Sequence, residues 1–198
     1  MDYSYYWLDM AWPGDGIMML IGVAGPARSG KDTIGAYLVA EYGFTRVSFA
    51  DPIKNMVATL LNVSVEWINN ETNKEELIPG VGYSPRHLLQ TIGTEWARNT
   101  LDESFWIRVA ERQIDRFAKE NFKGVVITDC RFPNEAEMIR TRQGMIWHVE
   151  RPGYPTVQNH ASETGILIDK FTDWNFANSD SISALHDQID LFFQHSPL

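Results

Sequence analysis

The sequence predicts an α/β fold in which a mainly parallel, five-stranded sheet is covered by helices on both faces. Short apolar runs typical of buried strands alternate with longer segments that carry apolar residues at helical spacing. Such alternation makes successive strands parallel, because each helix returns the chain to the same end of the sheet. With 198 residues, 44% of them hydrophobic, the chain is long enough for one well-packed domain.

Five segments have the composition of buried strands. The first, residues 19 to 24, is an uninterrupted apolar run, and the others contain β-branched or aromatic residues next to a polar position. The later four are "TRVSFA" (45–50), "GVVITD" (124–129), "MIWHV" (145–149) and "WNFAN" (174–178).

The segments after the first two strands have helical periodicity. Ile34, Tyr37, Leu38 and Tyr42 share one face of a helix that Gly43 is placed to end. The next helix is "DPIKNMVATLL" (51–61), with Asp51 as N-cap, Pro52 at the first helical position and a stripe of apolar side chains. That stripe consists of Ile53, Met56, Val57, Leu60 and Leu61.

Residues 62–84 are rich in Asn, Glu, Gly and Pro, which predicts a looser segment with one short helix. A helix then begins at "SPRHLLQTIGTEWAR" (84–98), and its apolar residues Leu88, Leu89, Ile92 and Trp96 are expected to be buried. Its polar side carries Arg86, Gln90 and Thr94 at four-residue steps, so these three share a face.

Three further helices are expected. One spans residues 103–120 and buries Ile107, Ala110, Ile114 and Phe117. The second starts with Asn134 and Glu137 in a capping-box-like arrangement and stops near Gly144. The last carries one stripe made of Ile182, Leu185, Ile189, Phe192 and Phe193.

Charge and cysteine content narrow the class of protein. The net charge of −9 argues against a nucleic-acid-coating surface, since such surfaces neutralise phosphates with basic patches. No apolar run approaches the length of a membrane span. The single cysteine, Cys130, excludes an internal disulfide and fits a reducing cytoplasm. Residues 1–17 are acidic and aromatic, lack the features of a signal peptide, and form an N-terminal extension of no assigned function.

Chemistry-bearing residues follow the predicted strands. In parallel sheets ligands bind beyond the carboxyl ends of the strands. The segments that leave these ends are 25–33, 51–54 and 129–131, together with Arg151 and Asn178. Glycines, cations and carboxylates should therefore meet at one edge of the sheet.

The segment "GPARSGK" (25–31) fits the phosphate-loop pattern G-x-x-x-x-G-K, with a strand before it and a helix after it. Backbone N–H groups of the loop and of the first helical turn would surround the β- and γ-phosphates of a nucleotide. Lys31 would reach the phosphate that is transferred. The pattern predicts a P-loop NTPase-type three-layer αβα fold.

Asp32 occupies the position where a hydroxyl that contacts Mg²⁺ is usual. In nucleoside monophosphate kinases the motif is commonly G-K-x-T, and here Thr33 supplies that hydroxyl, directly or through water. Asp32 would repel phosphate if it pointed inward, so we expect it to face outward.

Beyond the loop, the chain resembles the deoxynucleoside monophosphate kinases of tailed bacteriophages. The matching segments, in order, are "RSGKDT", "DPIK", "RHLLQTIGTEW", "FWIRVA", "TDCRFPNEAEMI", "HVERPG" and "HASETGI". The resemblance implies one kinase domain over residues 18–198, with a helical substrate-binding region at 62–122 and a lid-like loop at 150–170. It also implies a cytoplasmic enzyme of the infected cell that uses ATP and Mg²⁺. A homodimer is left open.

The same resemblance implies site residues. Those for ATP are Arg28, Gly30, Lys31, Asp32, Thr33 and Ile34. Those for the deoxynucleotide are Ile53, Lys54, Arg86, Gly93, Thr94, Trp106, Asp129, Arg131 and Glu135.

The residue types themselves favour several of these roles. Asp129 ends a strand, where an acid can order Mg²⁺-bound water or hold the acceptor, and Arg131 suits contact with transferring phosphate. Lys54 lies in a first helical turn, where the dipole disfavours a cation unless an anion binds there. Gln90 shares the polar face of Arg86, and Arg151 suits the leaving group of ATP.

For Trp106, stacking on a base and packing in the core both remain open, and Arg98 is an even choice between site and surface. His148, His160 and Cys130 are expected to be structural, and no spacing suggests a zinc site.

The sequence thus predicts transfer of the γ-phosphoryl group of ATP to a deoxynucleoside 5′-monophosphate (dNMP) for DNA precursor supply, with Lys31, Arg131 and Asp129 as catalytic residues. Another small-molecule P-loop kinase, acting on dephospho-coenzyme A or phosphomevalonate, is one alternative. A non-catalytic nucleotide-binding protein is the other.

Overall fold

The computed structural model describes residues 18–120, 122–153, 166–169 and 172–195. The described residues form two compact units, one within residues 18–47 and 114–195 and the other made of residues 48–113. The first contains the sheet and the second is helical. The expected extension at 1–17 and most of the expected lid-like loop lie outside the described residues. The expected helical region at 62–122 overlaps the second unit and stays a prediction as a substrate-binding region.

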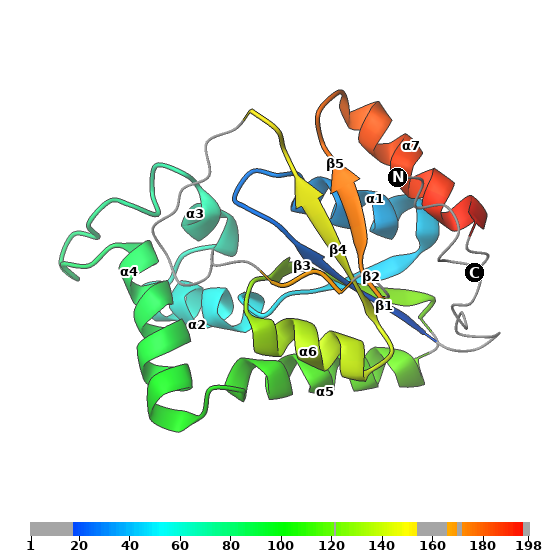
Figure 1. Cartoon of the computed structure of the whole chain (residues 1–198). Coiled ribbons are helices and arrows are strands. Elements are labelled where there is room, and N and C mark those ends of the chain that lie inside the picture. The colour runs from blue at the N-terminus through cyan, green and yellow to red at the C-terminus, as the bar shows by residue number, and fades with distance from the viewer. Residues whose placement is uncertain (1–17, 121, 154–165, 170–171, 196–198) are drawn as a thin grey trace. The chain divides into compact units, whose positions relative to one another are not determined.

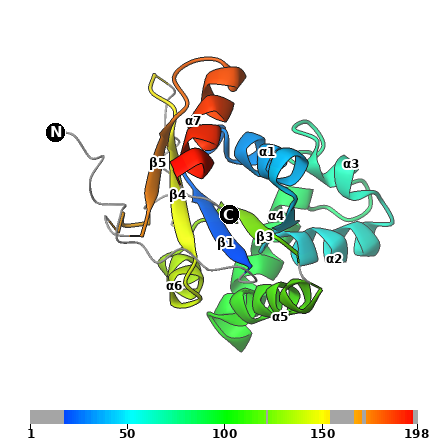
Figure 2. The same cartoon turned by 90° about the vertical axis from the view of Figure 1, so that its right-hand side faces the viewer.

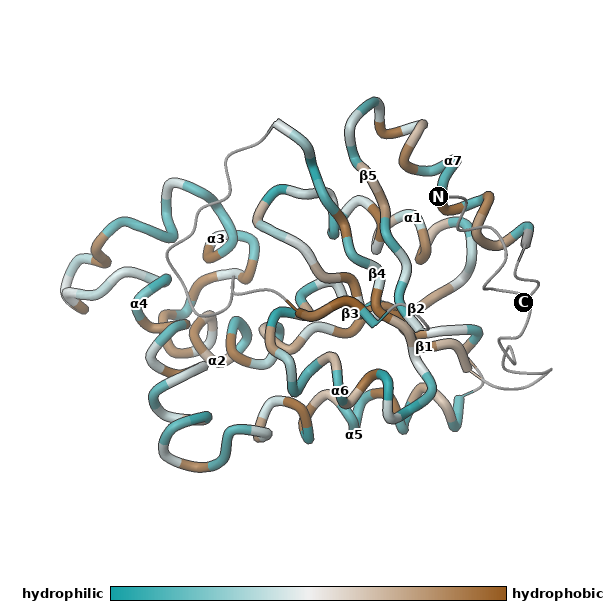
Figure 3. Tube along the Cα trace, viewed as in Figure 1, coloured by the Kyte–Doolittle hydropathy of each residue, from teal (hydrophilic) through white to brown (hydrophobic). Residues whose placement is uncertain are grey.

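The sheet of the first unit has five parallel strands in the order β2-β3-β1-β4-β5 (Figure 1). Their bounds are β1 Met19–Ala24, β2 Phe44–Val47, β3 Gly124–Cys130, β4 Met145–Glu150 and β5 Trp174–Ala177. The parallel α/β architecture predicted from the sequence is confirmed. Hydrophobic residues concentrate along the central strands (Figure 3), as expected for strands covered on both faces.

Helices cover both faces of the sheet (Figure 2). Helices α1 (Lys31–Tyr42) and α7 (Ile182–His195) pack on one face, where Ile34, Leu38 and Leu185 join Trp147 in the main core. On the other face α6 (Pro133–Thr141) packs on β1 and β4. The end of α5 (Phe105–Lys119) lies beside it, where Asp115 accepts a hydrogen bond from Arg142 at 2.7 Å. No helix among the described residues is long and apolar enough to cross a membrane.

Three sequence predictions for this unit were wrong in detail. The second strand ends at Val47 rather than at Ala50, because the chain bends there and the Ala50 N–H donates to Ser48 Oγ at 3.2 Å. Helix α6 is capped by Glu135 rather than by Asn134 and Glu137, as described below. Ile182 is 63% exposed, because it lies in the first turn of α7, ahead of the residues that pack on the sheet.

The second unit consists of α2 (Asp51–Leu61), α3 (Val65–Asn69), α4 (Pro85–Gln90), the π-helix η1 (Thr91–Leu101) and the start of α5. The single short helix expected between residues 62 and 84 is confirmed as α3. Asp51 lies in the first turn of α2, and Ala50 is the N-cap, contrary to prediction. Met56 and Leu60 are also exposed, because α2 turns Ile53, Val57 and Ala58 inward instead.

The helix predicted from residue 84 changes its winding after Gln90. From Thr91 it is a π-helix, in which backbone bonds join residues five apart. Its wider turn brings Gly93 and Ala97 inside and leaves Trp96 42% exposed, contrary to prediction, while Leu88, Leu89 and Ile92 are half-buried. π-helical segments are rare in proteins, and those that occur are often found at functional sites.

A buried ionic cluster around Asp173 holds the chain in place just before β5. The Asp173 carboxylate is inaccessible to solvent and accepts hydrogen bonds from Arg140, from His148 Nε2 at 2.8 Å and from the Asp169 N–H at 2.9 Å. Burial alone would raise the pKa of Asp173, but the bonds from His148 and Arg140 outweigh it and lower that pKa from 3.8 to about 2.

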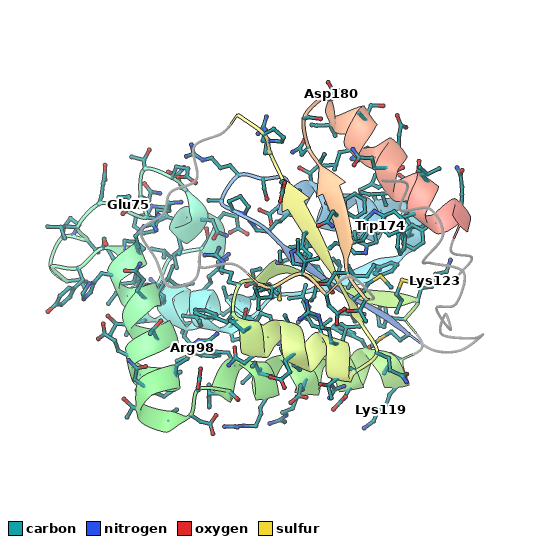
Figure 4. The ribbon with its side chains drawn as sticks, viewed as in Figure 1. Glu75, Arg98, Lys119, Lys123, Trp174 and Asp180 are labelled. Atoms are coloured by element: carbon teal, nitrogen blue, oxygen red, sulfur yellow. The ribbon has the colours of Figure 1, made fainter. Side chains whose placement is uncertain are left out.

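This lowered pKa predicts an acid-sensitive contribution to stability. Because the folded-state pKa lies below the unfolded one, the contribution is complete above pH ~4 and is lost as pH falls through about 2. Its size is about 2 kcal/mol, from roughly 1.4 kcal/mol per pKa unit. Denaturant unfolding of the wild type and Asp173→Asn should therefore show a stability gap that is wide at pH 7 and narrow near pH 2. Asp180→Asn, which removes an exposed carboxylate (Figure 4), is the control. A gap that stays constant with pH would contradict the assignment.

Candidate active site

The carboxyl ends of four adjacent strands converge at one edge of the sheet. Ala24, the last residue of β1, pairs with Cys130 of β3 on one side and with His148 of β4 on the other. Glu150 at the end of β4 pairs with Ala177 at the end of β5. The predicted meeting of the loop at 25–33 with residues 129–131, Arg151 and Asn178 is therefore confirmed. Residues 51–54 belong to the second unit.

The phosphate loop has a backbone that requires glycine at both ends. Gly25 has φ +149°, and a Cβ there would lie 2.3 Å from the Val149 carbonyl oxygen of β4. Gly30 has φ +111°, and a Cβ there would lie 2.6 Å from Asn178 Nδ2. Arg28, between them, adopts φ +62°, an uncommon conformation for a side-chain-bearing residue that often marks a binding site. Each of the two glycines of the motif is therefore required for a structural reason of its own.

Helix α1 begins at the end of this loop with Lys31. Its N-cap is Gly30, so no side chain caps the first N–H groups of the helix. Lys31 Nζ bends back over the loop and donates to the carbonyl oxygens of Gly25 at 2.9 Å and Pro26 at 2.6 Å. A cation thus lies at the loop beside an open, positively polarised helix end, which is an arrangement suited to a phosphate chain.

Asp129 lies near the end of β3 and Arg131 directly follows that strand, beside the loop. The register between β1 and β3 shifts between Gly22 and Ala24, so β3 has an irregularity at Thr128–Asp129. Such bulges re-aim side chains, and Asp129 is half-buried here whereas its neighbours Thr128 and Cys130 are buried. The exposed Arg131 side chain has no ion pair or hydrogen bond among the described residues. Burial, with smaller contributions from Glu135 and Asp129, raises the pKa of Cys130, so its thiol stays neutral and packed.

Glu135 holds the backbone that carries Arg131. Its carboxylate is 2% exposed, and its Oε2 accepts hydrogen bonds from the N–H groups of Arg131 at 2.8 Å and Phe132 at 3.1 Å. These are N–H groups at the start of α6, so Glu135 both caps the helix and fixes the turn after β3. The resemblance implied a substrate contact for Glu135, and the contacts in the structure are with backbone.

The other expected ATP residues surround the loop. Arg151, after β4, is half-buried, and its Nη1 lies 3.5 Å from the Arg28 carbonyl oxygen. Asp32 is exposed, as its expected outward orientation requires, and Thr33 is half-buried one position further into α1. Ile34 is buried in the core, so any contact with nucleotide would come from its backbone.

The expected acceptor residues of the second unit lie on four helices, α2, α4, η1 and α5. Lys54 is half-buried in the first turn of α2, with no ion pair among the described residues. Arg86, Gln90 and Thr94 are all exposed, and Arg86 forms an ion pair with Glu75 of the preceding loop. Arg98 Nη1 donates to the Glu103 carbonyl at 3.3 Å.

Trp106 packs inside the second unit. Its ring is 3% exposed among Ile53 and Ala97, and its Nε1 donates to the Gly93 carbonyl at 2.9 Å. This is the packing alternative left open by the sequence. The bond ties the ring to the π-helix at Gly93, next to Thr94, so Trp106 supports the backbone of two expected acceptor residues.

The oxygen ligands present fit Mg²⁺ rather than a metal held by protein alone. The described residues contain no group of three or more His, Cys, Asp or Glu able to hold an ion. Mg²⁺ is commonly held by one or two protein oxygens together with phosphates and water. Thr33, in the first turn of α1, and Asp129, near the end of β3, are residues of that kind.

Comparison with known proteins shows the family to which the chain belongs. The sequence profile of deoxynucleotide monophosphate kinases matches residues 19–84 and 62–189, which together span most of the chain. The chain belongs to the deoxynucleotide monophosphate kinase family. A candidate deoxynucleotide monophosphate kinase of Acanthamoeba polyphaga mimivirus is 32% identical over 188 residues, covering 87% of this chain and 94% of the relative. The deoxynucleoside-5′-monophosphate kinase of Escherichia phage T5 is 26% identical, covering 79% and 92%.

Solved structures show the same fold at low identity. Protein TT1252 from Thermus thermophilus aligns with a TM-score of 0.53 at 16% identity, covering 90% of this chain and 97% of that one. A sugar kinase from Janibacter aligns with a TM-score of 0.52 at 13% identity, covering 91% and 96%. Both alignments support the α/β fold of this chain.

The structure gives two residues of the site contacts that the sequence analysis did not predict. Asn178 was recognised only as leaving a strand end, yet its side chain contacts the phosphate loop. The assignment of Glu135 to substrate stays a prediction, and the capping role seen in the structure could have been predicted from the "FPNE" segment, because proline at the first helical position puts Glu135 at the capping position.

The contacts of Glu135 predict that its charge matters less than its acceptor oxygen. Glu135→Ala should destabilise the protein by roughly 1–3 kcal/mol, because buried N–H groups at the start of α6 lose their partner. Glu135→Gln retains an oxygen and should recover most of this loss in urea unfolding, with a KM for the acceptor close to that of the wild type. A normal stability combined with a raised acceptor KM in Glu135→Gln would instead show direct contact with substrate.

Proposed function

We propose that this member of the family transfers the γ-phosphoryl group of ATP to a dNMP, producing the diphosphate for DNA precursor synthesis in a phage-infected cell. The observation that carries the proposal is the open N-terminus of α1, with Lys31 folded over the glycine loop and the Asp129–Arg131 turn on the neighbouring strand end. The family match supports the choice of acceptor.

The loop is built to bind the phosphates of ATP. The N–H groups at the start of α1 would donate to β- and γ-phosphate oxygens, in place of the missing side-chain cap. Lys31 would exchange its bonds with the Gly25 and Pro26 carbonyls for one with the transferring phosphate. Arg28 and Arg151, which lie together at this edge, add positive charge for the leaving group.

Phosphoryl transfer to a monophosphate needs no strong general base. The acceptor oxygen is already anionic, so the protein contributes alignment and neutralisation of charge on the transferring group. Arg131, directly after the end of β3, would supply the positive charge that neutralises this group. Its backbone N–H is held by the Glu135 carboxylate. When bound, Mg²⁺ would neutralise negative charge on the ATP phosphates. Thr33 and Asp129 are the residues that would hold it.

The acceptor would be bound by the helical unit. Lys54, a half-buried cation in a first helical turn, and Arg86 are suited to the dNMP phosphate. The π-helix supplies Gly93 and Thr94, and Gln90 lies just before it. Ile53 and Trp106 pack together in a buried cluster of this unit.

The proposal is tested by acceptor-dependent ADP release. With ATP and Mg²⁺, a coupled assay over the four common dNMPs, the matching ribonucleotides and dephospho-coenzyme A should show turnover with at least one dNMP and none with dephospho-coenzyme A. Turnover with dephospho-coenzyme A alone, or ATP binding without any acceptor-dependent turnover, would contradict it.

Lys31→Ala should lower kcat by at least ~10²-fold, which is the scale of losing one preorganised charge contact. The control is Lys119→Ala, which removes an exposed lysine near the end of α5 (Figure 4) and should turn over like the wild type. Matching far-UV circular dichroism spectra would show that both variants are folded. Near-normal turnover of Lys31→Ala would remove Lys31 from the reaction.

A further inference from the structure

We propose that Asn178 is a positioning residue of the phosphate loop, whose side-chain amide fixes the Ser29–Gly30 peptide and thereby the affinity for ATP. The inference deepens the proposed function and rests on its assignment of the loop to ATP. It concerns a residue that lies 149 positions from Ser29 in the sequence and outside the phosphate-loop motif.

The amide contacts the loop at one point. Asn178 Nδ2 donates to the Ser29 carbonyl oxygen at 2.8 Å. Ser29 itself is 1% exposed, and its hydroxyl has no hydrogen-bond partner among the described residues. The Ser29 side chain therefore does not hold this part of the loop by a hydrogen bond, and the Asn178 amide does.

The contact sets the direction of a phosphate-binding group. In a trans peptide the C=O of one residue and the N–H of the next point in opposite directions. Because the Ser29 carbonyl is directed toward Asn178, the Gly30 N–H is directed away from it. That N–H belongs to the group of donors at the start of α1, so Asn178 orients one donor of the anion site without touching the anion.

Gly30 and Asn178 also fit one another sterically. A Cβ on Gly30 would come within 2.6 Å of Asn178 Nδ2 and within 3.5 Å of Asn178 Cγ. The amide therefore occupies the space that a side chain at position 30 would need. The second glycine of the motif leaves room for the amide as well as allowing the backbone conformation at φ +111°.

Asn178 is in turn fixed by its own surroundings. Its N–H donates to the Glu150 carbonyl at 2.8 Å, which extends the pairing of β5 with β4. On the outer side of β5, Gln188 of α7 bonds both backbone groups of Ala177, the N–H through Oε1 at 3.2 Å and the carbonyl through Nε2 at 3.0 Å. Figure 4 marks this segment between Trp174 on β5 and Asp180 in the following loop. The amide is thus presented from a backbone held on both sides.

The test compares ATP affinity in two variants and a matched control. Asn178→Ala removes the donor, and Asn178→Asp keeps the shape but turns a carboxylate toward the Ser29 carbonyl. Asn175→Ala removes an exposed asparagine from β5, the strand that Asn178 follows. Isothermal titration with Mg²⁺·ATP gives Kd without any acceptor, and steady-state kinetics give KM for each substrate.

We expect Asn178→Ala to weaken ATP binding about five- to tenfold, the effect of losing one hydrogen bond. Asn178→Asp should weaken it at least as much, because its charge also repels phosphate. In both variants the dNMP KM should stay within about twofold of wild type, and Asn175→Ala should bind ATP normally.

ATP affinities of both Asn178 variants within about twofold of wild type would overturn the inference. Equal increases in both KM values with a lowered melting temperature would also overturn it, because they would indicate general destabilisation. If the wild type binds ATP but phosphorylates no dNMP, the proposed function fails while the titrations still decide the role of Asn178. A wild type that does not bind ATP would overturn both.

Discussion

The start of α1 is a helix end to which the protein gives no side-chain cap. Glycine is the N-cap residue, so no N-cap side chain bonds to the first N–H groups of the helix, and their dipoles add to the charge of Lys31. An uncapped helix end costs stability unless water or a ligand satisfies it. The remaining features of the sheet edge follow from the need to keep this end open and correctly shaped for phosphate.

The neighbouring strands supply that shape. The β4 carbonyl of Val149 leaves no space for a side chain at Gly25, and the Asn178 amide after β5 takes the space beside Gly30. On the other side, the irregularity in β3 turns Asp129 toward a half-buried position next to the loop, and Glu135 fixes the turn that carries Arg131. A parallel sheet brings these elements together because every strand ends at the same edge. The site is thus a consequence of the strand order as much as of the motif.

Sequence reasoning succeeded where the signal is local. The apolar run before "GPARSGK", the alternation of strands with helices and the strand-end rule were sufficient to predict the sheet and most residues of its edge. It failed where the partner is distant or the winding changes. Nothing near Asn178 or Asp173 in the sequence reveals Ser29 or Arg140 as partners, and 3.6-residue periodicity misplaced Trp96 because η1 is a π-helix. For Glu135 the local signal existed, but the capping box was placed two residues too late, at Asn134 and Glu137.

The central claim is that the backbone N–H groups at the start of α1 bind the phosphates of ATP. Backbone amide NMR of the ¹⁵N-labelled protein, titrated with a non-hydrolysable ATP analogue and Mg²⁺, tests it most directly. The account predicts that the largest shifts in the sheet-containing unit fall on the amides from Gly30 to Thr33, with smaller shifts at Arg131 and Asn178. Saturable binding that leaves the amides from Gly30 to Thr33 unchanged would contradict it.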